Sequence, residues 1–124
     1  LFDTLGDWLN KNISAIAESC GARAIVKFRK ITPPVNNDVE INQILRESAI
    51  ELFGRENVIE LQKPSLGAED FAEFLNYVPG SMFRLGVSGK NGCAPLHSSE
   101  FDPEEESLRV AIQLLTKTIV ELNK

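Results

Sequence analysis

His97 is the residue of this chain best suited to metal binding or proton transfer, and it is the only histidine in the sequence. A neutral imidazole binds zinc-like metals and exchanges protons near neutral pH. Pro95-Leu96-His97-Ser98 is expected to form a loop ahead of a helix, and loops often display functional groups. A lone histidine is more often a surface residue, because one ligand does not make a metal site. From the residues alone, both interpretations of His97 stay open.

A second candidate is the acidic pair Glu69-Asp70, which follows Gly67 at the predicted start of a short helix. A glycine at this place allows the backbone to approach another group closely. Acidic groups in a first helical turn are also stabilised by the helix dipole, so the pair can be explained without any function. The loop is therefore a candidate site whose structural explanation is equally good.

Other catalytic signatures are missing from the sequence. There is no nucleophile elbow, no phosphate-binding glycine loop and no dinucleotide fingerprint. The two cysteines, Cys20 and Cys93, lack metal-pair or redox spacing, and with one histidine they cannot complete a metal site of the usual kind. Cys20 lies on the apolar side of a predicted helix, which indicates a buried reduced thiol. The residues alone leave the function open.

The period of the apolar residues changes along the chain and predicts α/β architecture. Pro33-Pro34 cannot continue the hydrogen bonding of a strand, so we expect an extended crossover at residues 32–37. Thr4 and Asp38 are expected at helix starts, and Asp102 with Pro103 predicts the start of the last helix. The predicted order is a helix over 4–20, a strand over 22–31, a helix over 38–53, a strand over 58–61, a short helix from 69, a strand over 81–87, and a helix from 102 with the apolar stripe Leu108, Ala111, Ile112, Leu115, Ile119 and Leu122.

Composition excludes some classes of protein. The formal net charge is −5, with 13 basic residues scattered among 18 acidic ones, so nucleic-acid binding is not expected. No apolar run is long enough to cross a bilayer and no signal peptide opens the sequence, so no membrane partner is expected. Since nothing demands an oxidising compartment, the prediction is a cytoplasmic protein.

Five short motifs together resemble the C-terminal third of the aminoacylase-like dinuclear metallopeptidases of clan MH, across essentially all 124 residues. The resemblance is closest to their N-acyl-amino-acid amidohydrolase branch, which includes hippurate and indoleacetyl-amino-acid hydrolases. Each motif is weak singly, and the order and spacing of the five give the resemblance its strength. The motifs are Pro33-Pro34-Val35-Asn36-Asn37-Asp38, Gly54-Arg55-Glu56-Asn57-Val58, Gly67-Ala68-Glu69-Asp70-Phe71, Val78-Pro79-Gly80 with Leu85-Gly86, and Pro95-Leu96-His97-Ser98 with Phe101-Asp102.

The resemblance implies two parts: residues 1–34 as the last helix and strand of an inserted lid domain, and residues 35–124 as the C-terminal part of the catalytic domain. The lid usually mediates dimerisation, which implies a homodimer. Two divalent metals, zinc or manganese, would activate water for hydrolysis of a small N-acyl amino acid. His97 matches the last metal ligand in sequence, and the other ligands and the general-base glutamate lie upstream in the family.

The resemblance also makes Gly67, Glu69 and Asp70 residues that line the site. Leu66 and Ala68 replace the Met and the Gly or Ser that are frequent in the family, which leaves substrate preference open. The chain begins at Leu1, directly before a helix signal, and we expect a fragment whose partner is the missing N-terminal part of its own chain. We expect this fragment to bind no metal firmly and to be inactive alone. The alternative is a non-catalytic binding or dimerisation module of the same architecture.

Overall fold

A computed structural model describes residues 2–29 and 31–124, which form two compact units. The first unit ends at Pro33 and the second runs from Pro34 to Lys124. Leu1, and the part of the predicted first strand at Lys30, lie outside the described residues. No helix in the described part is long and apolar enough to cross a membrane.

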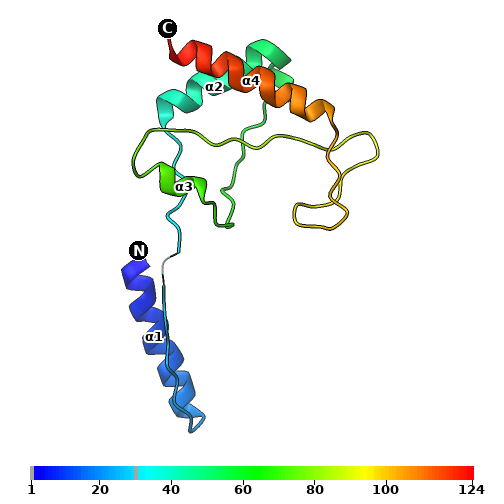
Figure 1. Ribbon diagram of the computed structural model, residues 1–124. Coiled ribbons are helices and arrows are strands. Elements are labelled where there is room, and N and C mark those ends of the chain that lie inside the picture. Colours follow the sequence, from blue (N-terminus) through cyan, green and yellow to red (C-terminus); the bar gives the residue numbers. More distant parts are fainter. Residues whose placement is uncertain (1, 30) are drawn as a thin grey trace. The chain divides into compact units, whose positions relative to one another are not determined.

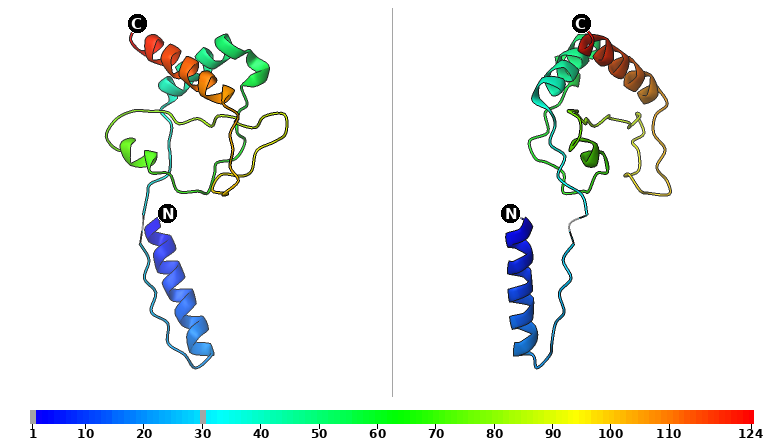
Figure 2. Two further views of the ribbon diagram at one scale, coloured as in Figure 1. Left: turned by 45° about the vertical axis from the view of Figure 1, so that its right-hand side comes forward. Right: turned by 60° about the vertical axis from the view of Figure 1, so that its left-hand side comes forward.

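The first unit consists of helix α1, Phe2–Ser19, and an extended segment that runs back along it (Figures 1 and 2). Gly21, with φ 69°, is the left-handed residue after the helix and reverses the chain. A Cβ added to Gly6 would lie 3.0 Å from Cδ1 of Phe28, so glycine lets this ring approach the helix. Thr4 lies inside α1, so its prediction as the N-cap was wrong. Cys20 is exposed, so the prediction of a buried thiol was wrong too.

The second unit is built on helices α2, Val39–Phe53, and α4, Glu106–Leu122, which pack against each other (Figure 1). Their buried side chains are Leu45, Ser48 and Ala49 from α2, with Ser107, Leu114 and Thr118 from α4. Small residues let the two backbones come close. Lys117 Nζ lies 2.9 Å from Glu51 Oε2, and this hydrogen bond between the helices raises the pKa of Lys117.

Short elements connect these two helices. Asp38 caps α2 as predicted, because its Oδ1 accepts a hydrogen bond of 3.0 Å from Ile41 N. Gly54, with φ 85°, ends the helix at the predicted residue. A 3₁₀ turn, Arg55–Asn57, follows, and the short helix α3, Phe71–Phe74, begins directly after the acidic pair.

The predicted strands are not formed in the described part of the chain. Residues 22–29, 58–61 and 81–87 have no strand partner, and the isolated bridge Gly89–Gly92 is the only β-pairing in the described residues. In the first of these segments Ala24 and Val26 are half-buried, while Ile25 is 81% exposed and Phe28 is 44% exposed. A strand exists only when another strand accepts and donates its hydrogen bonds. The α/β architecture therefore stays a prediction.

The last helix departs from the prediction in two ways. It begins at Glu106 instead of Pro103, because Glu104 N donates a hydrogen bond of 2.9 Å to Val87 O and holds this residue in the loop. Its predicted apolar stripe is not buried: Leu108 and Ile112 are each 65% exposed. The side of α4 that α2 covers is instead the one that carries Leu114 and Thr118, so the predicted buried stripe with Leu108 and Ile112 was wrong.

Adjacent leucines of α4 test this assignment. Leu114 is 4% exposed and Leu115 is 47% exposed. We expect Leu114→Ala to lower the free energy of unfolding by about 2–4 kcal/mol, because it leaves a cavity against α2. Leu115→Ala, the matched control, should change it by less than about 1 kcal/mol. Urea unfolding followed by circular dichroism measures both, and equal losses would contradict the assigned face.

Replacing each of two serines in the α2–α4 interface by alanine should change the free energy of unfolding in opposite directions. Ser48 Oγ is buried without a hydrogen-bond partner in the described part of the chain, whereas Ser107 Oγ donates to Glu104 O at 2.6 Å. Ser48→Ala should raise the free energy of unfolding by about 1 kcal/mol, because a desolvated hydroxyl is removed and alanine favours the helix. Ser107→Ala should lower it by a similar amount. Calorimetry compares the two, and a destabilising Ser48→Ala would show that the hydroxyl has a partner in solution.

Candidate functional site

His97 occupies a tight turn with an unusual backbone. Ser98 N donates a hydrogen bond of 3.1 Å to Pro95 O, which closes a turn whose third residue is His97. The φ of His97 is 70°, and no other non-glycine residue in the described part of the chain has a positive φ. Turns of type II need a positive φ at this position, where glycine is preferred. A residue with a side chain thus occupies a backbone conformation that favours glycine.

The ring of His97 is exposed and forms no hydrogen bond or ion pair within the part of the chain that the structure describes. The following turn is fixed by its neighbour, because Glu100 N donates to Ser98 Oγ at 3.1 Å and Phe101 N donates to Ser98 O at 3.2 Å. The imidazole is therefore available to a ligand, on a turn that is held by backbone hydrogen bonds. Backbone strain of this kind costs about 1–3 kcal/mol and is concentrated at functional sites.

The second candidate loop is also open. Gly67 N donates to Ser65 Oγ at 3.1 Å, and Glu69 O accepts from Ala72 N at 3.1 Å. Asp70 O accepts from Glu73 N at 3.0 Å, so the pair starts α3 through its main chain. The side chain of Glu69 is half-buried and that of Asp70 is exposed, and neither forms a hydrogen bond or ion pair in the described residues. Both carboxylates are therefore available to bind a ligand.

The structure does not assemble these residues into a metal centre. Within residues 2–29 and 31–124, no three His, Cys, Asp or Glu side chains are grouped so that they could hold a metal ion. The residues present therefore do not fit a two-metal centre by themselves, since a metal site needs three or four ligands. A cleft shared by His97 and the Gly67–Asp70 loop stays a prediction.

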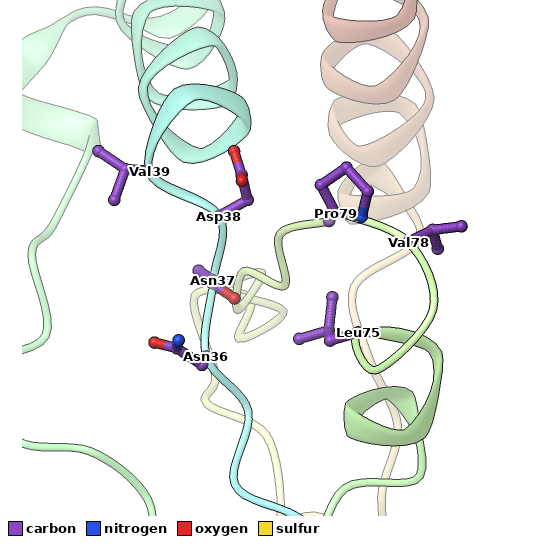
Figure 3. A pocket seen from close by; sticks show the side chains of 8 residues that line it. Asn36, Asn37, Asp38, Val39, Leu75, Val78 and Pro79 are labelled. Carbon is purple, nitrogen blue, oxygen red and sulfur yellow. The ribbon is translucent and has the colours of Figure 1, made fainter.

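A hollow of about 310 Å³ lies elsewhere in the second unit (Figure 3). Leu75 points toward the 36–38 segment, whereas Val39 and Val78 point away from it. Asp38 cannot serve as a free ligand because it caps α2. None of the four predicted site residues lines this hollow, which is formed by Asn36, Asn37, Asp38, Val39, Leu75, Val78, Pro79 and Gly80.

Asn37 holds the walls of this hollow together, a role that the sequence did not indicate. Its Nδ2 donates to Met82 O and its Oδ1 accepts from Met82 N, both at 2.9 Å. Asp38 N donates to Gly80 O at 2.8 Å beside them. The amide side chain thus imitates a neighbouring strand, and only the position of residue 82 in space reveals it. The hollow therefore results from the hydrogen bonds that tie these segments together, and it offers no group of free polar side chains.

Comparison with known proteins identifies the family. Residues 8–121 match the model of peptidase family M20/M25/M40, so the chain belongs to this family. A Synechocystis sp. protein named as a probable hydrolase is 32% identical over 114 residues, which cover 90% of this chain and 29% of that protein. Thermostable carboxypeptidase 1 of Saccharolobus solfataricus is 33% identical over 84% of this chain and 26% of its own length.

A third relative is the N-acetyldiaminopimelate deacetylase of Lactococcus lactis, which is 35% identical over 62% of this chain and 20% of its own length. The chain thus spans less than a third of each of these three relatives. No solved structure is a match. The family that the five motifs resembled is confirmed by these findings.

The backbone of His97 leads to a test that is independent of activity. A left-handed conformation costs a residue with a Cβ about 1–2 kcal/mol relative to glycine. We expect His97→Gly to be more stable than His97→Ala by about 1 kcal/mol, because glycine removes this strain. Urea unfolding of the two variants measures the difference. The order would be reversed if the turn changes to a negative φ in solution.

Proposed function

We propose that this chain is the C-terminal part of a metal-dependent amidohydrolase that cleaves the amide bond of an N-acyl amino acid or a small peptide. The observation that supports this most is the family match over residues 8–121, which includes His97 in its Leu-His-Ser context. The relatives named as a deacetylase of an N-acetylated amino acid and as a carboxypeptidase both act on amide bonds of amino acids. The proposed substrate, an N-acyl amino acid or a small peptide, covers the substrates that these two names indicate.

The proposed cofactors are two divalent metals, zinc or manganese, with His97 as one ligand. Its exposed ring and fixed turn suit this role, since a ligand needs a free ring nitrogen and a defined position. The described residues supply too few other donors, so no step of the reaction is assigned to the metals within this chain. Gly67, Glu69 and Asp70 are proposed to line the substrate side of the same site.

The proposed partners are the remaining part of the polypeptide and a second copy of the protein. Exposed apolar residues of α1, including Trp8 at 58% and Ile16 at 66%, support a dimer through a lid formed by residues 1–34. A cytoplasmic location rests on the cysteine usage. The alternative is a non-catalytic binding or dimerisation module of the same architecture. The lack of a grouped metal site in the described residues does not separate the two functions, because the other ligands are expected upstream under both.

Activity and metal content decide between these two functions. In the full-length protein, His97→Ala should lower the hydrolysis of N-acyl amino acids by about a hundredfold or more, because a metal loses a ligand. Ser99→Ala, an exposed neighbour on the same loop, is the matched control and should retain activity. The 124-residue chain should show no turnover with zinc or manganese added. The enzyme interpretation fails if His97→Ala keeps both its activity and its metal by elemental analysis.

A further inference from the structure

The loop of residues 88–103 contains the single Asn-Gly pair of the sequence, Asn91-Gly92. Gly92 N donates a hydrogen bond of 3.0 Å to Gly89 O, which closes a turn with Lys90 and Asn91 at its corner. Gly92 has a φ of 84°, whereas Lys90 and Asn91 do not have a positive φ. This combination is a type I turn followed by a left-handed glycine, which is common in hairpins. Asn91 and Gly92 are both exposed at the tip of this turn.

The side-chain amide of Asn91 forms no hydrogen bond within the described residues. Most other asparagines have a side chain that binds another group of the chain, namely Asn12, Asn37, Asn42, Asn57, Asn76 and Asn123. Asn10 has no such bond either, but it lies inside α1, where main-chain hydrogen bonds fix the backbone. Asn36 is followed by another asparagine. Among the described asparagines, only Asn91 combines an unbound amide with a loop position and a following glycine.

We propose that Asn91 is a site of spontaneous deamidation through a cyclic imide formed with Gly92. The main-chain nitrogen of Gly92 loses its proton to a base in the solvent and attacks the side-chain carbonyl carbon of Asn91. A bond forms between this nitrogen and Cγ, the bond from Cγ to Nδ2 breaks, and Nδ2 leaves as ammonia. Water then opens the imide at either of its two carbonyl groups. The products are an aspartate or an isoaspartate at position 91, and the reaction needs only water and base.

The turn must open before the ring can close, because the N–H of Gly92 is bound to Gly89 O. The bridge between these two glycines is isolated, so no neighbouring strand pair holds it closed. Opening an exposed loop tip costs little free energy, since no buried apolar contact is lost. Residue 92 is also suited to the attack, because glycine has no Cβ to crowd the nitrogen and adopts a φ of 84° without strain.

The reaction would change the loop that carries His97. Glu104 N donates to Val87 O, and this hydrogen bond closes the loop of residues 88–103. The imide removes the N–H that Gly92 donates within the turn, and an isoaspartate lengthens the main chain by one methylene group. A new carboxylate would also appear in a turn that Glu104 already approaches, since a Cβ on Gly89 would collide with Oε2 of Glu104. Two carboxylates at one place disfavour each other's ionised form.

Incubation of the folded 124-residue chain in mildly alkaline buffer tests the proposal, with digestion and tandem mass spectrometry as the readout. We expect the amide at position 91 to become an acid at least about tenfold faster than any other asparagine, because its loop tip opens most easily. Both aspartate and isoaspartate should form. A synthetic peptide of residues 85–96 is the reference, and the folded chain should react within about tenfold of its rate. An intact Asn91 in the chain, under conditions that deamidate the peptide, would overturn the proposal.

Two variants separate the role of Gly92 from the mobility of the loop. Gly92→Ala should slow the reaction by about tenfold or more, because a Cβ crowds the attacking nitrogen. Ala94→Gly, the matched control, places a further glycine on the same loop and should leave the rate unchanged. Equal rates in the unaltered chain and in Gly92→Ala would contradict the proposal, as would aspartate without isoaspartate, which would show direct hydrolysis of the amide. None of these measurements depends on the proposed hydrolase activity.

Discussion

The second unit depends on the packing of α2 against α4, because the rest of this unit is a 3₁₀ turn, the short helix α3 and segments without regular structure. The interface is narrow. Leu45, Ala49 and Leu114 supply its apolar contacts, and the polar Ser48 and Thr118 lie among them. Thr118 Oγ1 donates to Leu114 O at 2.8 Å, while Ser48 Oγ has no partner in the described part. So few buried side chains give a small hydrophobic contribution, and the unit must be correspondingly weak by itself.

Two sets of hydrogen bonds connect the loops to these two helices. Asn37 and Asp38 hold residues 80–82 beside the start of α2, and Glu104 N holds Val87 close to the start of α4. The segment between these hydrogen bonds is consequently extended without being part of a sheet. This arrangement explains why residues that alternate like a strand show no strand pairing, and it places unsatisfied main-chain groups beside the helical pair.

The proposed site has the opposite character, since it consists of loops with exposed functional groups. The turn at His97 keeps a positive φ with an exposed side chain that forms no hydrogen bond or ion pair in the described residues, so the core gives no reason for a histidine there. Metal binding would supply such a reason. The acidic pair Glu69-Asp70 differs, because its main chain begins α3 and that role alone accounts for its place. His97 is therefore the stronger of the two candidates.

Local chemistry in the sequence determined the ends of α2, the start of α3, the reversal at Gly21 and the position of the candidate residues on loops. Caps and left-handed glycines act within a few residues, so they can be predicted from the chain alone. The family was also predictable, because five motifs kept their order and spacing. The sequence could not decide which stripe of α4 is buried, since Leu108 and Leu114 are both leucines. Only the tertiary structure decided this, because burial depends on the element that packs against each face and a strand depends on a neighbour to share its hydrogen bonds.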